Sequence, residues 1–359
     1  MTCVKFMVQQ EGPLDAAETI WHSRPMLGAE EARACADVVS SGMFIGGEAT
    51  ALFRRRLMGL AGNATAQLFS SGRQALLAAL RTLELPPRSG VVMPTYVCDA
   101  VAWAVTAAGL RPVLCDVGQH WLVTPETVEA AIDPDCAAIL LPPPFGLLQS
   151  AKPFRDFGLP IIHDLCQASP QLLAETQSGD LGDILVLSFH PTKYACAGGG
   201  GATLSFTAKY GARLAVIEQE RMGDSPFTEL QAAIGSVQLE KLAAFSTRRT
   251  ELYMRYAAAI PDPVLDTLHS ARDVPEGYLL RMPLIVPHGL ASDYFPAFAE
   301  RGIIVRQGVD NLVHRRLALS DDAFPNAADA FARTLSMPFY PALSDVEASR
   351  VAEALTAIL

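Results

Sequence analysis

The chain has 359 residues, of which 50% are hydrophobic and 18% are charged, and its formal net charge is −10. This composition predicts a folded protein with a large core, and the length suits one large α/β domain with a smaller second domain. The acidic balance argues against nucleic acid or an anionic membrane as a partner, because both bind clustered Lys and Arg.

No apolar run reaches the ~18 residues that span a bilayer, and the first eleven residues lack the apolar core and cleavage site of a signal peptide. We therefore expect a soluble cytoplasmic protein. The seven cysteines are scattered, odd in number and without CxxC spacing. This pattern favours neither a disulfide framework nor a zinc site.

The first part of the chain predicts an N-terminal arm over residues 1–24, where no periodicity is visible, and then two helices. The first helix begins at Gly28 and the second covers residues 48–59. From Ala64 onward, strands alternate with helices over about 150 residues. The expected strands are 64–69, 91–96, 111–116, 137–141, 159–164 and a last one from 184 to 188. This alternation predicts a mainly parallel sheet covered by helices on both faces.

A long helical region is expected beyond Thr203, with apolar residues at helical spacing over residues 229–242. Strands over 279–286 and 302–305 and a closing helix over 344–359 then predict a smaller α+β unit. The expected organisation is an arm over residues 1–24, a large domain over 25–245 and a small C-terminal domain over 246–359, with the long helix bridging the two domains.

A lysine follows the strand Ile184–Ser188, whose apolar side chains lead into Phe-His-Pro-Thr-Lys193. A buried parallel strand would deliver Lys193 to the carboxyl edge of the sheet, where α/β proteins keep their sites. A lysine amine at such a place can form a Schiff base with an aldehyde. From this stretch alone, a lysine that merely starts a surface loop is the better interpretation.

Other strand ends strengthen the functional interpretation of Lys193. Asp164 ends one predicted strand, Ser188 ends the next, and the turn Ser71-Gly72-Arg73 opens a helix whose first N–H groups are free. Pyridoxal phosphate needs a lysine for its aldehyde carbon, a carboxylate for its ring nitrogen, N–H groups and hydroxyls for its phosphate, and a flat side chain such as Tyr96 over its ring. Together, these residues predict a pyridoxal phosphate site.

Five blocks of sequence, in order, carry a resemblance to a known family. They are Ser70-Ser-Gly-Arg-Gln-Ala-Leu, Asp164-Leu-Cys-Gln-Ala, Ser188-Phe-His-Pro-Thr-Lys, the stretch from Glu229-Leu-Gln-Ala to Glu240-Lys-Leu, and Ser336-Met-Pro-Phe-Tyr-Pro-Ala-Leu-Ser. With these blocks the chain resembles the DegT/StrS-type aminotransferases. These are pyridoxal-phosphate enzymes of fold type I that act mostly on nucleotide-linked keto sugars.

The resemblance implies that Lys193 holds the cofactor aldehyde and then moves the proton between substrate and cofactor. It also implies that Asp164 pairs with the ring nitrogen and that Gln167 bonds to the ring hydroxyl side. An amino donor, usually glutamate, would convert the cofactor to its pyridoxamine form, which then aminates a keto sugar.

The resemblance further implies that Ser188 and the turn Gly72-Arg73 hold the phosphate, and that Tyr96 lies over the ring. It also implies a homodimer in which sites are completed across the subunit interface. Small molecules, the amino donor and the keto acceptor, would be the other partners.

Several positions depart from the family pattern. Gly199 stands where a glutamate is usual, and Tyr194 follows the lysine where an asparagine is usual. Asp224 and Pro226 replace an Asn and an Arg, and an aspartate would repel a phosphate. Arg73 replaces a small residue and could restore a positive charge to the site. These changes favour cofactor binding over a standard nucleotide-sugar substrate.

Two alternative functions stay open from the sequence. One is another reaction at the same cofactor, such as the dehydration run by relatives that carry His where this chain has Lys193. The other is a regulatory or binding protein that kept the cofactor or only the fold, although no basic recognition helix supports it.

Five further residues carry side chains that could act on a substrate. His163, His190 and His314 could be acid–base groups, but each is better interpreted as a satisfied structural histidine. Arg315-Arg316 could meet a substrate anion, against the alternative of a solvated surface.

Overall fold

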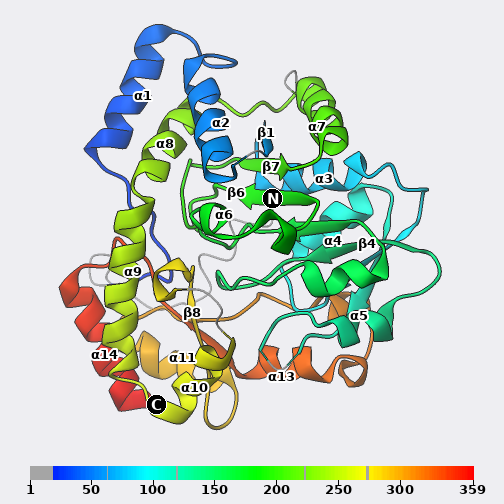
Figure 1. Ribbon diagram of the computed structural model, residues 1–359. Coiled ribbons are helices and arrows are strands. Elements are labelled where there is room, and N and C mark those ends of the chain that lie inside the picture. The colour runs from blue at the N-terminus through cyan, green and yellow to red at the C-terminus, as the bar shows by residue number, and fades with distance from the viewer. Residues whose placement is uncertain (1–18, 63, 119, 222–223, 272–274) are drawn as a thin grey trace.

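The structure is a computed structural model that describes residues 19–62, 64–118, 120–221, 224–271 and 275–359 (Figure 1). Most of the predicted arm over residues 1–24 therefore lies outside the described residues.

The described residues form α-helices, short 3-10 helices and two β-sheets. The α-helices are α1 (Ala29–Ser41), α2 (Glu48–Leu60), α3 (Gly72–Thr82), α4 (Asp99–Ala107), α5 (Pro125–Ala131), α6 (Leu172–Glu175), α7 (Ala208–Arg221), α8 (Glu229–Glu240), α9 (Leu242–Ala257), α10 (Asp262–Ala271), α11 (Ala291–Ala299), α12 (Val313–Arg316), α13 (Pro325–Arg333) and α14 (Asp345–Ile358). The 3-10 helices are η2 (Lys152–Phe157), η3 (Ser178–Asp180), η4 (Glu276–Tyr278) and η5 (Asp321–Ala323). None of the helices in this part of the chain is long and apolar enough to cross a membrane.

The strands are β1 (Thr65–Phe69), β2 (Gly90–Pro94), β3 (Arg111–Cys115), β4 (Cys136–Leu141), β5 (Ile161–Asp164), β6 (Ile184–Ser188), β7 (Gly201–Ser205), β8 (Met282–Ile285), β9 (Arg306–Gln307) and β10 (Thr334–Met337). The large sheet has the order β1-β7-β6-β5-β4-β2-β3. Neighbours from β3 to β6 are parallel, whereas β7 runs antiparallel to both β6 and β1. The prediction of a mainly parallel sheet is confirmed, and β7 is the strand that it missed.

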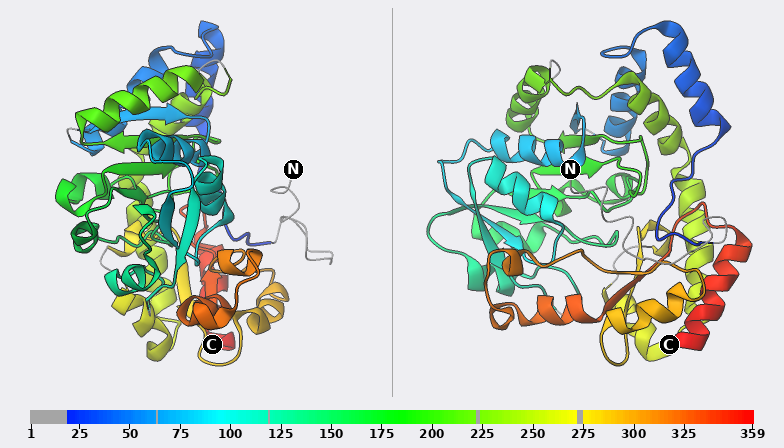
Figure 2. Two further views of the ribbon diagram at one scale, coloured as in Figure 1. Left: turned by 90° about the vertical axis from the view of Figure 1, so that its right-hand side faces the viewer. Right: turned by 180° about the vertical axis from the view of Figure 1, so that it is seen from behind.

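Side chains of the large sheet alternate between its two faces. On β2, Val91 and Met93 join the cluster under α3 and α4, and Val92 joins the cluster on the opposite face. Helices cover both faces of the sheet in Figures 1 and 2. Because both faces are buried, the parallel strands are apolar throughout their length. This is why the sequence shows them as short continuous apolar runs.

The smaller unit has a three-stranded sheet with the order β8-β10-β9. The prediction of a strand over residues 302–305 was wrong. Gly302 has a left-handed backbone (φ 69°) at the end of the α11 turn, and Ile303 makes only a single bridge to Ile20. The strand begins later, at Arg306, because the chain must first complete this turn.

Two successive helices, α8 and α9, connect the large sheet to the smaller unit. α8 packs on α1 and α2, and α9 packs beside α14 (Figure 1). The backbone departs from regular α-helical geometry at Lys241, which has φ −90° and ψ 0° and lies between α8 and α9. The predicted long helix is therefore interrupted. A domain boundary near residue 245 is a proposal that agrees with this change of neighbours.

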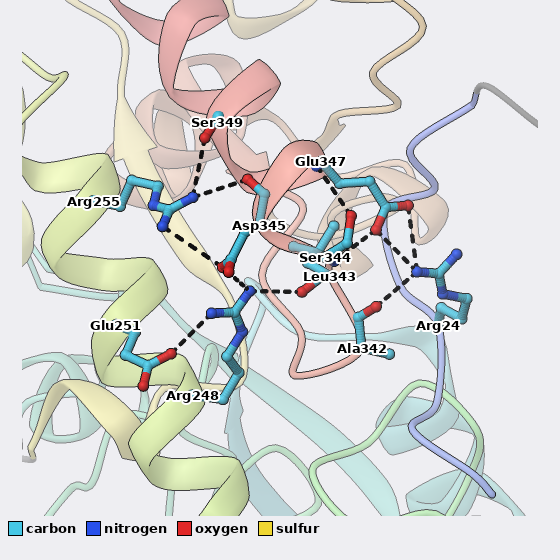
Figure 3. A network of polar contacts seen from close by, with 10 residues as sticks. All are labelled: Arg24, Arg248, Glu251, Arg255, Ala342, Leu343, Ser344, Asp345, Glu347 and Ser349. Atoms are coloured by element: carbon cyan, nitrogen blue, oxygen red, sulfur yellow. Dashed lines mark hydrogen bonds and ion pairs between the residues drawn. The ribbon is translucent and has the colours of Figure 1, made fainter.

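Arginines of α9 and of the N-terminal segment hold the start of α14 (Figure 3). Arg248 donates to the Leu343 carbonyl at 2.8 Å and pairs with Asp345 at 2.9 Å. Arg24 donates to the Ala342 carbonyl at 2.7 Å and pairs with Glu347 at 3.1 Å. These contacts tie the segment before α14 to the N-terminal segment and to α9. That segment is part of the wall of a cavity beside Lys193.

Candidate active site

Two neighbouring parallel strands end in polar side chains at one edge of the large sheet. Asp164 ends β5 and lies opposite Val186 of β6, and Ser188 ends β6 two residues later. Ile162, Ile184 and Val186 belong to the cluster under α3. Because side chains alternate along a strand, Asp164 and Ser188 face the same side of the sheet as these residues. The sequence predicted this convergence, and the structure brings the two residues together.

Lys193 lies in the loop that follows β6. Its backbone N–H donates to the His190 carbonyl at 2.8 Å, and Ala197 N–H donates back to the Phe189 carbonyl at 2.9 Å. The Tyr194 hydroxyl donates to the Gly277 carbonyl at 2.6 Å, and Tyr194 is buried. The loop is therefore closed on itself and tied to η4. These contacts hold Lys193 between the large sheet and the smaller unit.

The start of α3 lies directly against Ser188. Gly201 of β7 pairs with Phe69 and with Ser188, so β1 and β6 end at the same edge. A Cβ on Gly72 would stand 2.7 Å from Ser188 Cβ and 2.8 Å from its Oγ. Glycine is therefore required where the helix meets the strand end.

The first turn of α3 offers free backbone N–H groups. Ser71 caps the helix by accepting from Gln74 N–H at 3.2 Å, and Ala75 N–H donates to the Ser71 carbonyl at 3.0 Å. The N–H groups of Gly72 and Arg73 have no partner among the described residues. Free N–H groups at the positive end of a helix dipole form an anion site.

Asp164 is buried, with 7% of its surface exposed, and one of its oxygens accepts from Cys166 N–H at 3.0 Å. Burial raises the pKa of its carboxyl group, while the Cys166 bond and the charge of Lys193 act in the opposite direction. The Cys166 thiol also lies within hydrogen-bonding reach of this carboxyl group, and no other donor among the described residues bonds to it. A buried carboxylate with remaining acceptor capacity can accept a bond from a protonated ring nitrogen.

Gln167 accepts from the Phe145 N–H through its Oε1 at 2.9 Å. This bond fixes the orientation of the side-chain amide and leaves Nε2 without a partner among the described residues. The Nε2 group is a donor, which suits an oxygen such as the ring hydroxyl that the resemblance assigns to Gln167.

Tyr96 is the predicted cofactor residue that the structure does not bring to this edge. It is 1% exposed, its ring packs edge-on against Phe145 at 6.4 Å, and Gly308 lies against its hydroxyl group. A side chain that stacks on a cofactor must present a ring face to the site, and every side of Tyr96 is covered by protein. The structure therefore does not support the placement of Tyr96 over the ring.

Cys98 is the residue of the same loop that approaches the site. It reaches the surface at the start of α4. The surrounding protein raises the pKa of its thiol, the charge of Lys193 lowers this pKa and the charge of Asp164 raises it. Both charges act on this thiol, which makes Cys98 a candidate for a position near the site. Sequence reasoning selected the aromatic residue and missed Cys98, which carries no signal of its own.

Arg73 is exposed, and its guanidinium lies over the ring of Trp103 at 5.1 Å. Its backbone belongs to the anion site at α3, whereas its side chain stacks on α4. The predicted phosphate contact of the Arg73 side chain stays a prediction.

The three histidines have different surroundings. His314 is fully buried between Thr95 Oγ1 at 2.8 Å and Asp321 Oδ1 at 2.9 Å, which confirms a satisfied structural role. His163 is also fully buried, but neither ring nitrogen has a partner among the described residues, so its expected satisfaction was wrong. His190 is exposed and contacts Thr192 Oγ1 at 3.0 Å.

These residues together fit pyridoxal phosphate. An amine, a buried carboxylate with remaining acceptor capacity, a free amide donor and a helix start with unpaired N–H groups converge at one sheet edge. Each group has the hydrogen-bonding character that one part of this cofactor requires. No group of three or more His, Cys, Asp or Glu side chains that could hold a metal ion occurs among the described residues.

Comparisons with known proteins agree with this assignment. A sequence profile of the DegT/DnrJ/EryC1/StrS aminotransferase family matches residues 25–356. The dTDP-4-dehydro-2,3,6-trideoxy-D-glucose 4-aminotransferase of Saccharopolyspora spinosa is 32% identical, over 92% of this chain and 94% of that protein. The spore coat polysaccharide biosynthesis protein SpsC of Bacillus subtilis is 24% identical, over 94% and 96% respectively.

Solved structures show the same fold. Spr1654 of Streptococcus pneumoniae matches in its PMP form with a TM-score of 0.82 at 19% identity, over 95% of this chain and 97% of that chain. Its PLP form matches with a TM-score of 0.80 at 18% identity, over 95% and 98%.

The chain therefore belongs to the DegT/DnrJ/EryC1/StrS aminotransferase family, as the five sequence blocks predicted. It is a pyridoxal-phosphate-dependent aminotransferase with the type I fold, and pyridoxal phosphate is its cofactor. The predictions of family, fold class, enzyme class and cofactor are confirmed.

Proposed function

We propose that this aminotransferase moves an amino group from an amino-acid donor, glutamate in the first place, to the keto group of a sugar carried on a nucleotide. The observation that supports it best is the relative from Saccharopolyspora spinosa, a 4-aminotransferase of a dTDP-linked keto sugar, which matches 92% of the chain. The identity of the acceptor and the position of its keto group are the parts of this proposal that extend beyond the family assignment.

Each residue at the sheet edge would have one role in binding the cofactor or in proton transfer. Lys193 Nζ holds the aldehyde carbon of the cofactor and later carries the proton between the substrate carbon and the cofactor. The Asp164 carboxylate would accept a hydrogen bond from the N–H of the pyridine ring, and Gln167 Nε2 would donate a hydrogen bond to the ring oxygen. When bound, the cofactor supplies an electron sink for the bonds at the substrate carbon.

Ser188 and the N–H groups of Gly72 and Arg73 would hold the phosphate. The free N–H groups of α3 and the contact between Gly72 and Ser188 support this assignment. In this proposal Cys98, whose thiol is affected by the charges of Asp164 and Lys193, takes the position over the ring that was assigned to Tyr96. A thiol offers less apolar area than an aromatic ring, so the ring is covered less completely in this chain.

Two of the departures from the family pattern have a packing explanation. Tyr194 binds the Gly277 carbonyl, and the guanidinium of Arg249 lies 4.7 Å above its ring. Gly199 has a φ of 154°, and a Cβ there would stand 3.1 Å from Gln231 Nε2. Neither residue change therefore indicates a different reaction. Because Lys193 is present at the end of the β6 loop, transamination is favoured over dehydration and over a binding protein without activity.

A homodimer completes the proposal. Met43, Phe44 and Ile45 form an exposed apolar loop between α1 and α2, and the neighbouring Met26 and Leu27 are also exposed. Figure 1 shows α1 and α2 together at one end of the large sheet. Apolar side chains that gather on a surface indicate an interface, and a second copy of the chain is the partner that the family suggests.

A cytoplasmic location stays an expectation from the sequence.

The proposal can be tested with the purified protein and added pyridoxal phosphate. The loaded protein should absorb in the yellow region, and Lys193→Ala should abolish this band. Addition of glutamate should convert the band to that of the pyridoxamine form, and a nucleotide-linked keto sugar should then restore it. A protein that stays colourless, or a loaded protein that no amino acid converts, would refute the proposed function.

A further inference from the structure

The Lys193 loop borders a cavity between the large sheet and the smaller unit. The cavity comprises about 380 Å³ of space when open solvent is included, of which only about 20 Å³ is accessible to water-sized centres, and Lys193 and Arg281 both line it. The N-terminal segment 23–26 and the segment 339–341 complete the wall. A molecule that reaches the Lys193 amine from this side lies within the space that Arg281 borders.

Arg281 is a half-buried guanidinium just before β8. Its Nη1 donates to His22 Nδ1 at 2.6 Å and lies 3.4 Å from the His22 carbonyl oxygen. His22 in turn contacts Ser336 Oγ at 3.0 Å. Burial, with the charges of Arg281 and Arg306, holds the pKa of His22 well below its ordinary value, so this ring is a neutral partner. The bond to His22 orients Arg281 and leaves its charge uncompensated.

No carboxylate lies within ion-pair distance of Arg281 among the described residues. Burial lowers the pKa of its guanidinium to about 9, and the charges of Arg306 and Arg249 act in the same direction. Asp310 acts in the opposite direction but forms no ion pair with it. A half-buried cation beside two further cations is unfavourable unless an anion joins it.

The other two arginines of this cavity wall make more hydrogen bonds than Arg281, although the Nε of Arg249 has no partner among the described residues. Arg249 donates to the carbonyls of Leu279, Leu280 and Phe339 at 2.7 to 3.1 Å. Arg24 has Glu347 and the Ala342 carbonyl (Figure 3). Arg281 lines the cavity, and within the described part of the chain its acceptors are only the ring of His22 and, at 3.4 Å, the His22 carbonyl oxygen. This contrast indicates that the charge serves a ligand and not the fold.

We propose that Arg281 is a substrate-binding residue that takes a carboxylate of the amino donor. The inference rests on the proposed function, because only an amino-acid donor brings a carboxylate to Lys193 beside the reacting amine. The planar guanidinium can bind a carboxylate with two parallel hydrogen bonds, which orients the donor as well as attracting it. The sugar ring that carries the keto group is neutral, so at the reacting end of the acceptor Arg281 gains nothing comparable; the anionic phosphates of the acceptor lie on its nucleotide part.

The test is the single half-reaction of the loaded enzyme with glutamate, followed by the absorbance of the cofactor. Arg281→Gln should raise the half-saturating glutamate concentration about 10- to 100-fold, since two charge-assisted bonds are lost. Arg281→Lys should recover part of this loss. The control Arg306→Gln removes a neighbouring positive charge outside the cavity wall and should change the value less than about threefold. Binding of glutarate, an unreactive dicarboxylate, should weaken in Arg281→Gln by calorimetry.

Further readouts separate a ligand role from a structural one. The reaction of the pyridoxamine form with the keto acceptor should be the same in Arg281→Gln and wild type, and the melting temperature of the variant should not fall, because an unfavourable charge is removed. Unchanged glutamate dependence and glutarate binding in Arg281→Gln would overturn the inference. An equal loss with donor and acceptor would also overturn it, because it would indicate a general structural defect. A wild-type enzyme that binds glutarate through Arg281 but is converted by no amino acid would instead refute the proposed function.

Discussion

His163 is the buried histidine whose protonation the fold opposes, and it allows a quantitative prediction. It lies on β5 immediately before Asp164, on the opposite face of the sheet. It is fully buried, and neither ring nitrogen has a hydrogen-bond partner among the described residues. Burial, with a smaller effect from Arg155, lowers its pKa from 6.5 to about 3.

The direction of the effect follows from these two pKa values. Below about pH 6.5 the unfolded chain binds a proton at this position, and the folded chain does not until about pH 3. The free energy of unfolding therefore falls as the pH is lowered through 6.5, by about 1.4 kcal/mol per pH unit. At about pH 5, His163 alone should cost about 2 kcal/mol relative to neutral pH.

We predict that His163→Leu removes this acid sensitivity. Urea unfolding of the loaded protein, followed by circular dichroism at about pH 7.5 and about pH 5, gives the free energy for variant and wild type. The free energy of unfolding of the variant minus that of the wild type should increase by about 2 kcal/mol from the higher to the lower pH. His288→Leu, which changes an exposed histidine after β8, should show no such growth. Growth below about 0.5 kcal/mol in His163→Leu would refute the reasoning.

Three further predictions concern the site and its support. Gly72→Ala should weaken pyridoxal phosphate binding at least about tenfold, because its Cβ would meet Ser188 at 2.7 Å. Gly59→Ala, which meets nothing within 4 Å, is the matched control, and equal binding in both variants would contradict the clash. Asp164→Asn should keep the lysine adduct but slow the glutamate half-reaction about 100-fold or more, because the ring nitrogen loses its anionic partner; an unchanged rate would exclude this role. Glu229→Gln should lower the free energy of unfolding by about 2 kcal/mol at neutral pH, since the carboxylate accepts from the N–H groups of Gly47, Ala49 and Thr50. Burial opposes ionisation of Glu229, but these bonds outweigh it and hold its pKa below 4.5, so the difference between variant and wild type should shrink as the pH falls below about 4. A difference that does not depend on pH would contradict this account.

Much of the site could be predicted from local sequence because the ends of parallel strands meet at one edge. Asp164, Ser188 and Lys193 each follow a short apolar run, and the alternation of side chains determines which face Asp164 and Ser188 share. The start of α3 was visible in the same way, as a strand, a turn of small residues and a helix. β7 was missed because the glycines before it conceal a strand of only five residues.

The choice between Tyr96 and Cys98 could not be made from the sequence. Both follow β2 in one loop, and local pattern does not say which side chain turns toward the site. In the structure, Val313 N–H donates to the Thr95 carbonyl at 3.1 Å, and His314 N–H donates to Thr95 Oγ1 at 2.9 Å. This contact, more than 200 residues distant in the chain, docks the loop on the smaller unit and is accompanied by the burial of Tyr96.

The sequence by itself determined most of the elements, the parallel sheet, the lysine and the carboxylate, because these depend on periodicity and on residues a few positions apart. Only the tertiary structure decided which side chains surround them. It put Cys98 on the surface at the start of α4, left both His163 nitrogens without partners among the described residues, and set Arg281 on a cavity with no carboxylate of the described chain paired to it. The physical reason is that burial and charge compensation are sums over neighbours from distant parts of the chain.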